Sequence, residues 1–127
     1  MYKNLVAALA AASLLLTQAA AQAPQPLKVA VVHVAPLTEA GWVRQHEEAR
    51  KAMQAALGDR VVTRSVENVP EGPDAERVIR DLARQGHGLI FTPSFGYMEP
   101  TLRVAREFPQ VRFASITGLK TAPHGAT

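Results

Sequence analysis

The chain contains no cysteine, and aromatic residues make up only 6% of its 127 residues. Without cysteine the protein can form no disulfide, and no thiol is available to carry a lipid anchor. The single tryptophan, Trp42, is therefore the most distinctive aromatic residue of the sequence.

Recognisable catalytic motifs are also missing. No G-x-G-x-x-G follows the first expected strand, which argues against a dinucleotide-binding enzyme. The absence of G-x-x-x-x-G-K-[ST] argues against a phosphate-binding loop, and the absence of G-x-S-x-G argues against the nucleophile turn of an α/β-hydrolase. Three isolated histidines lack the spacing of metal ligands: His33, His87 and His124. Four scattered carboxylates are interpreted as solvated surface residues: Glu67, Glu71, Glu76 and Glu99. We therefore predict no catalytic residue, no metal and no cofactor.

A long apolar run occurs only at the start of the chain. Lys3 precedes an apolar or small run over Leu5–Leu16, and Ala19–Ala21 offers an Ala-x-Ala cleavage site before Gln22. The run has about a dozen residues, fewer than the roughly 20 that span a bilayer as a helix. We predict a signal peptide over 1–21, cut after Ala21, and a periplasmic location; an uncleaved membrane anchor is the alternative.

Charge is low and evenly spread. The whole chain carries a formal net charge of +3, and the leader contains only one basic residue, Lys3. This weak excess does not favour nucleic acid as a partner. After an extended lead-in over 22–26, residues 27–127 are long enough for one small domain.

Hydrophobic periodicity predicts alternating strands and helices. Apolar, β-branched runs predict strands, and amphipathic spacing predicts helices that end near Gly58, Gly86 and Pro109. The expected strands cover 27–34, 60–66, 88–92 and 111–116, and the expected helices start near Trp42, Asp74 and Pro100. This order predicts an α/β fold with an open parallel sheet of strand order 2-1-3-4 and flanking helices.

The first helix has an apolar stripe that we expect to face the core. Trp42, His46, Ala49, Met53, Ala56 and Leu57 share one side, and Arg44, Glu47, Glu48, Arg50 and Lys51 lie outside it. In the second helix, Asp74 is expected as the cap, and Glu76 with Arg80 and Arg77 with Asp81 are expected to pair across one turn.

Ligands of open parallel sheets bind outside the carboxyl ends of the strands, where strand order reverses. Here that position lies between the first and third strands, and the loops that follow them are 35–41 and 93–98. They bring Trp42, Ser94, Phe95 and Tyr97 to one edge, which suits a flat, weakly polar ligand. The alternatives are structural: Trp42 as a staple between helix and sheet, Phe95 and His46 as core residues, and Ser94 and Tyr97 as turn residues.

Several segments together resemble the basic membrane protein family of ABC-transporter substrate-binding proteins. The resemblance runs from about Leu27 to the C-terminus, and Glu-Asn-Val-Pro-Glu-Gly at 67–72 and Ser-Phe-Gly-Tyr-Met at 94–98 are its most specific parts. Ala40-Gly-Trp42 and Thr117-Gly-Leu-Lys-Thr-Ala-Pro123 add to it. The resemblance implies a periplasmic receptor for a purine or nucleoside, with two α/β lobes of the type I periplasmic-binding fold that close on the ligand and dock on a membrane permease.

The resemblance also implies the site. Trp42 takes the place of the aromatic residue that stacks on the base, Ser94, Phe95, Gly96 and Tyr97 line the cleft, and Thr117 and Gly118 are neighbours. The sequence departs from the family pattern at Glu39-Ala40, where Asp-Gly is expected, and at Pro93 and Glu99, where threonine and asparagine are expected.

The resemblance implies a much longer chain with two lobes, so this sequence is expected to end inside the first lobe. It is therefore expected to form part of that lobe and to bind ligand weakly by itself. The remaining alternatives are a small exported α/β enzyme acting on a nucleoside or sugar, and a sensory receptor lobe.

Overall fold

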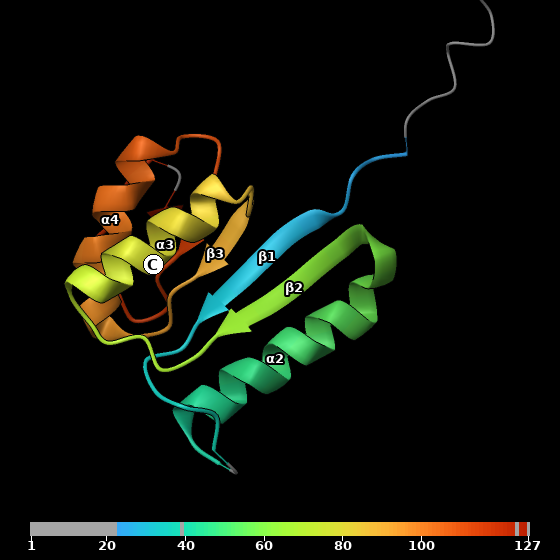
Figure 1. Ribbon diagram of the computed structural model, residues 1–127, viewed down its shortest axis with the longest axis horizontal. Coiled ribbons are helices and arrows are strands. Elements are labelled where there is room, and N and C mark those ends of the chain that lie inside the picture. The colour runs from blue at the N-terminus through green and yellow to red at the C-terminus, as the bar shows by residue number, and fades with distance from the viewer. Residues whose placement is uncertain (1–22, 39, 124, 127) are drawn as a thin grey trace, which may run out of the picture.

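The computed structural model describes residues 23–38, 40–123 and 125–126 (Figure 1). The predicted signal peptide and its cleavage site lie outside the described residues. The strands are β1 (Leu27–Val32), β2 (Val61–Val66), β3 (Leu89–Phe91), β4 (Arg112–Ala114) and β5 (Gly125–Ala126). The α-helices are α2 (Trp42–Leu57), α3 (Pro73–Arg84) and α4 (Met98–Glu107), and 3-10 turns cover Gly58–Arg60 and Phe95–Tyr97.

All pairs of neighbouring strands in the sheet are parallel. The strand order is β2-β1-β3-β4-β5, which confirms the predicted 2-1-3-4 arrangement and adds a short fifth strand at the edge. β1 lies between β2 and β3 and pairs with β2 over its full length, from Leu27 opposite Val61 to Val32 opposite Val66. The reversal of strand order therefore lies between β1 and β3, as the sequence indicates.

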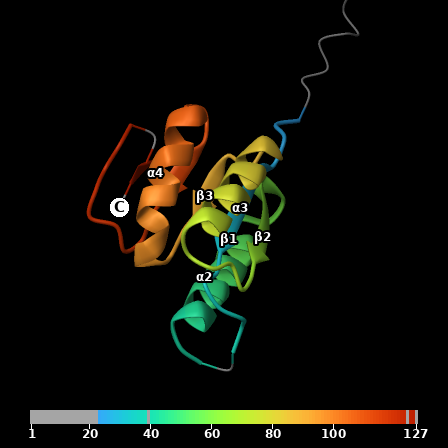
Figure 2. The ribbon, with the colours of Figure 1, turned by 60° about the vertical axis from the view of Figure 1, so that its left-hand side comes forward.

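The helices are distributed unequally over the two faces of the sheet. α2 lies on one face, and α3 and α4 lie together on the other, as two views of the ribbon show (Figures 1 and 2). Right-handed crossovers explain this: the connection from β1 to β2 moves across the sheet in one direction, and the later connections move in the opposite direction. Their helices must then lie on opposite faces.

The main core lies between the sheet and the pair α3 and α4. Ala30, Val32 and Ile90 supply the sheet side, and every one of them has no exposed surface. The helices contribute apolar residues at helical spacing, including Ala75, Ile79, Leu82 and Ala83 from α3 and Val104 and Ala105 from α4. Burial of this stripe fixes α3 and α4 against the sheet.

The predicted core face of α2 is wrong. Its buried residues are Val43 and Glu47, whereas Trp42, Ala49 and Ala56, which belong to the predicted stripe, are exposed. Part of the reason is that Glu47 has charged and polar partners between α2 and the sheet, so a carboxylate can occupy a buried position. The other part is that, among the residues that the structure describes, α2 is the one helix on its face of the sheet, so its apolar stripe has no helix from this part of the chain beside it.

Two details of α3 also differ from prediction. Gly72 is the residue before the helix and Pro73 begins it, so Asp74 lies in the first turn and makes no capping hydrogen bond with its side chain. The predicted pair of Arg77 with Asp81 is also wrong, because Arg77 pairs with Asp74 at 3.3 Å and Asp81 with Arg84 at 3.7 Å. The predicted pair of Glu76 with Arg80 is present at 2.7 Å. Within the described part of the chain, no helix is both long enough and apolar enough to cross a membrane.

Candidate functional site

Trp42 lies at the carboxyl edge of the sheet, as the first residue of α2. Gly41 precedes it with a φ of 95°, a left-handed conformation that favours glycine. The indole Nε1 donates a hydrogen bond of 2.6 Å to the backbone carbonyl of Pro93, in the loop after β3. The structure therefore brings together the two loops singled out from the sequence.

The Trp42 side chain is anchored but not buried. The residue is 49% exposed, and the His46 ring lies beside the indole with a centroid separation of 4.4 Å and a tilt of 51°. His46 is partly buried, and its Nδ1 donates to the Trp42 carbonyl at 2.9 Å. Because the indole N–H already has an acceptor, the exposed part of the ring is apolar surface with a fixed orientation.

The loop that accepts this hydrogen bond continues with Ser94, Phe95 and Gly96. Phe95 is 59% exposed, so its ring belongs to the surface and not to the core. Ser94 Oγ donates to the Glu71 carboxylate, and the backbone N–H of Gly96 donates to Glu71 Oε1 at 3.1 Å. Glu71 was interpreted from sequence as scattered surface, but it joins the loop before α3 to this edge.

Tyr97 is the predicted site residue whose position argues against a ligand contact. Its side chain is fully buried, and its hydroxyl donates a 2.5 Å hydrogen bond to the backbone carbonyl of Val69. Burial raises the pKa of the Tyr97 phenol well above its usual range, so the hydroxyl remains a donor at neutral pH. Tyr97 thus packs in the core and supports the loop from below.

Thr117 and Gly118 follow β4, the strand next to β3. Both are partly buried, and Thr117 Oγ1 is buried without a hydrogen-bond partner among the described residues. The neighbouring Ser115 Oγ is unpartnered in the same way. Leu119 N donates to Met98 Sδ at 3.2 Å, which ties this loop to the start of α4. The two hydroxyls therefore lie at the same carboxyl edge, one strand further along.

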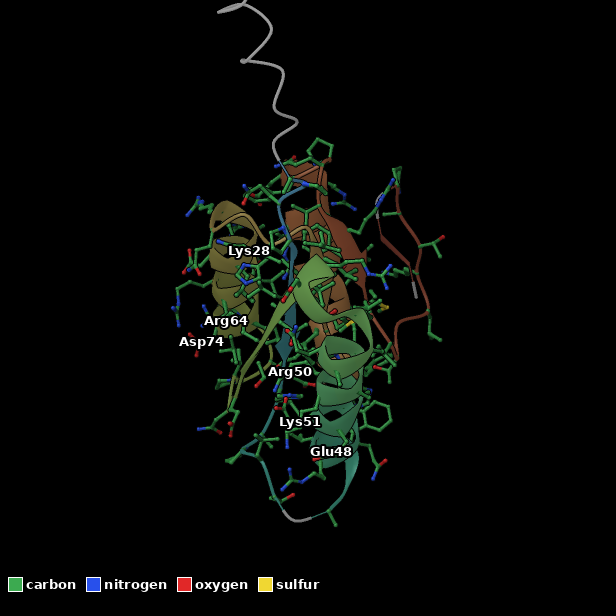
Figure 3. The ribbon with its side chains drawn as sticks, turned by 90° about the vertical axis from the view of Figure 1, so that its right-hand side faces the viewer. Lys28, Glu48, Arg50, Lys51, Arg64 and Asp74 are labelled. Carbon is green, nitrogen blue, oxygen red and sulfur yellow. The ribbon has the colours of Figure 1, made fainter. Side chains whose placement is uncertain are left out.

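Behind the edge lies a buried charged cluster that the sequence analysis missed. Glu47 on α2 is 3% exposed, and its carboxylate accepts hydrogen bonds from Arg50 at 2.5 and 2.9 Å and from His33 Nε2 at 3.4 Å. Arg50 points from α2 toward β2, where it donates to Thr63 Oγ1 at 2.8 Å (Figure 3). The Arg50 hydrogen bonds hold the pKa of Glu47 at about 2, against the opposing effect of burial.

An apolar groove lies on the α2 face of the sheet and encloses about 180 Å³. It is lined by Val31, His46, Ala49, Arg50, Met53, Phe91 and Ile116. Of the residues around the Trp42 ring, only His46 borders it. The groove follows from the half-covered sheet face and adjoins the predicted ligand edge through His46, which packs against Trp42, and through Ile116, which lies between Ser115 and Thr117.

The chemistry available at the edge is that of recognition. Exposed aromatic surface from Trp42 and Phe95 can contact a planar group, and the hydroxyls of Ser115 and Thr117 lie buried below the surface at the end of the next strand. Among residues 23–38, 40–123 and 125–126, no group of three or more His, Cys, Asp or Glu side chains could hold a metal ion. The arrangement favours binding of a small organic molecule.

Two sequence relatives match most of this chain. A purine-binding protein of Brucella abortus (strain 2308) is 53% identical over 103 residues, which are 81% of this chain and 29% of the relative. A protein of Haloferax volcanii, provisionally named an ABC transporter glucose-binding protein, is 31% identical over 97 residues, which are 76% of this chain and 24% of that relative. The chain thus spans less than a third of the length of either relative.

Solved structures show the same fold. A solute-binding protein of an ABC transporter system from Conexibacter woesei has a TM-score of 0.64 at 29% identity, covering 70% of this chain and 29% of its own. A transcriptional activator of the comK gene from Bacillus halodurans also has a TM-score of 0.64, at 23% identity over 78% of this chain and 32% of its own, which shows the fold alone.

Residues 27–124 match the family described as PnrA-like ABC transporter substrate-binding proteins. This range includes β1, the helices α2, α3 and α4, and the edge formed by Trp42 and the loop after β3. The chain therefore belongs to the PnrA-like family of ABC transporter substrate-binding proteins.

Proposed function

We propose that this chain forms one wall of the ligand site of a periplasmic solute-binding protein whose ligand is a purine base or nucleoside. The observation that carries the proposal is the fixed, half-exposed Trp42 ring at the strand-order reversal. The 53% identity to a purine-binding protein supports the ligand class.

Stacking on Trp42 is the expected main contact. A planar base matches an indole ring in shape, and such stacking is worth about 1–3 kcal/mol per base. The hydrogen bond from Nε1 to the Pro93 carbonyl fixes the ring before ligand arrives, so little side-chain entropy is lost on binding. Phe95, in the loop next to that carbonyl, adds a second exposed ring.

The polar contacts to the ligand are expected to come from the loop after β4. Thr117 Oγ1 and Ser115 Oγ are buried without partners, and a buried hydroxyl without a hydrogen bond is costly. A ligand with nitrogen or oxygen atoms along its edge would supply the missing partners once the loop after β4 moves to expose the two hydroxyls, which are covered in this structure. Gly118 would let the ligand approach the backbone there, because it carries no side chain. Of the predicted contacts we retain Trp42, Ser94, Phe95, Gly96, Thr117 and Gly118, and we leave out the buried Tyr97.

The role in transport is binding and not catalysis. In the full receptor, ligand held between two lobes would favour the closed state, and a membrane permease would read that state. Ligand sites bury 70–90% or more of a small ligand, and a single wall cannot do so. We therefore expect millimolar and not micromolar affinity from this chain alone. Export by the leader over 1–21 would place the protein in the periplasm.

The test is a calorimetric titration of residues 22–127 with adenine, guanosine and glucose, in the wild type and in Trp42→Ala. We expect weak binding of the two purines and a loss in the variant of about 5- to 150-fold, the equivalent of about 1–3 kcal/mol. Val62→Ala serves as the matched control, because Val62 is also an exposed apolar residue, at 55%, but lies within β2.

Two results would contradict the proposal. Binding of glucose without binding of either purine would assign the ligand class named for the Haloferax volcanii relative. Conversion of guanosine to products by the purified chain, followed by chromatography, would instead indicate an exported enzyme.

A further inference from the structure

Glu71 makes long-range contacts with the loop that holds Trp42. The carboxylate comes from the loop between β2 and α3 and accepts hydrogen bonds from Ser94 Oγ and from the Gly96 backbone N–H, the latter at 3.1 Å. Between these and β3 lies Pro93, whose carbonyl accepts the Trp42 indole N–H. A continuous series of hydrogen bonds and short backbone segments therefore connects Glu71 to the Trp42 ring.

Gly96 makes room for the same carboxylate. A Cβ atom placed on Gly96 would lie 2.1 to 2.5 Å from Cδ, Oε2 and Oε1 of Glu71, which are its three nearest neighbours. Gly96 is not among the residues with positive φ, so its backbone would accept an alanine. The absence of a side chain at 96 is thus explained by the space that Glu71 occupies.

We propose that Glu71 is a positioning residue that holds the 93–96 loop in place and, through the Pro93 carbonyl, fixes the orientation of the Trp42 ring. Hydrogen bonds to an ionised acceptor are stronger than those between neutral groups, which suits a carboxylate for fixing an exposed loop. The benefit for ligand affinity rests on the proposed function, whereas the link from Glu71 to Trp42 does not.

Trp42 fluorescence tests the link without any ligand, because the chain has only one tryptophan. In Glu71→Ala we expect a red-shifted emission maximum and stronger acrylamide quenching, because the ring loses its fixed acceptor. Since Trp42 is already 49% exposed, we expect full release to raise quenching by no more than about twofold. Glu71→Gln retains an acceptor oxygen and is expected to stay close to the wild type.

A double-mutant cycle separates positioning from a general loss of structure. Gly96→Ala should reproduce the fluorescence change in the wild-type background, because the new Cβ displaces the carboxylate. In the Glu71→Ala background the same substitution should have no further effect, because the atoms it meets are gone. Glu48→Ala, which removes an exposed carboxylate on α2, is the matched control and should leave the fluorescence unchanged.

Two outcomes would overturn the proposal, provided that circular dichroism shows folded protein. One is wild-type emission and quenching in Glu71→Ala. The other is an equal effect of Gly96→Ala with and without the Glu71 side chain. If Glu71→Ala does not fold, Ser94→Ala removes only one donor and should give a smaller change of the same sign. If the protein does not bind purines, the fluorescence and quenching results are unaffected, and only the proposed function is contradicted.

Discussion

Replacing the buried carboxylate of Glu47 by an amide is expected to destabilise the fold by about 3 kcal/mol at neutral pH. Arg50 holds the pKa of Glu47 at about 2, compared with 4.5 for an ordinary glutamate. Since one pKa unit corresponds to about 1.36 kcal/mol, this difference is worth about 3 kcal/mol. The value agrees with the roughly 3–5 kcal/mol lost when one partner of a buried ion pair is removed.

The sign of the pH dependence follows from the lowered pKa. Above pH 4.5 the carboxylate is ionised in the folded and unfolded states, and its full contribution to stability is present. As the pH falls from 4.5 toward 2, the unfolded state takes up a proton first, so the contribution is lost. The difference in unfolding free energy between the wild type and Glu47→Gln should therefore shrink over that range and approach zero near pH 2.

Urea unfolding followed by circular dichroism measures this difference. The matched control is Glu48→Gln on the same helix, whose side chain is 52% exposed and pairs with Arg44 and Lys51 at the surface (Figure 3). Exposed ion pairs contribute about 0–1 kcal/mol, so this variant should stay close to the wild type. Equal losses in the two variants at pH 7, or a difference that persists at pH 2, would refute the reasoning.

Two further substitutions probe buried polar groups away from the charged cluster. Tyr97→Phe removes the donor to the Val69 carbonyl and should lower the free energy of unfolding in urea by about 1–3 kcal/mol, while purine affinity stays unchanged. A loss of purine affinity at unchanged stability would show instead that Tyr97 belongs to the site. Burial lowers the pKa of His87, whose Nδ1 donates to the Leu82 carbonyl, so the folded state favours the neutral ring. Its contribution is present above pH 6.5 and declines as the pH falls, and His87→Gln should reduce the loss of stability between pH 7.5 and 5. An unchanged pH profile in that variant would contradict this explanation.

The order of elements could be predicted from the sequence because each depends on local periodicity. The helix Trp42–Leu57 has the predicted bounds, and the strand order follows from the alternation of strands and helices with right-handed crossovers. The face of α2 could not be predicted in this way. Glu47 can be buried because Arg50, three residues later on the same helix, pairs with it and because the fold brings His33 to it, whereas hydrophobic pattern alone counts Glu47 as a surface residue.

The site was predictable in part for a similar reason. Trp42 and the loop after β3 were placed correctly at one edge, because the position of strand ends follows from topology. The position of Tyr97 depends on the direction of one side chain in a 3-10 turn, which spacing does not determine. Glu71 contacts residues more than 20 positions away, and no local signal indicates that pairing.

Mapping the ligand contact by nuclear magnetic resonance tests the central claim most directly. In a titration of isotope-labelled residues 22–127 with adenine at millimolar concentration, we expect saturable shifts of the Trp42 indole N–H, of the backbone amides of 94–96 and of those near Thr117. Shifts confined to the opposite end of the strands, or no shift of the Trp42 signal at saturating adenine, would contradict the claim that this edge receives a purine.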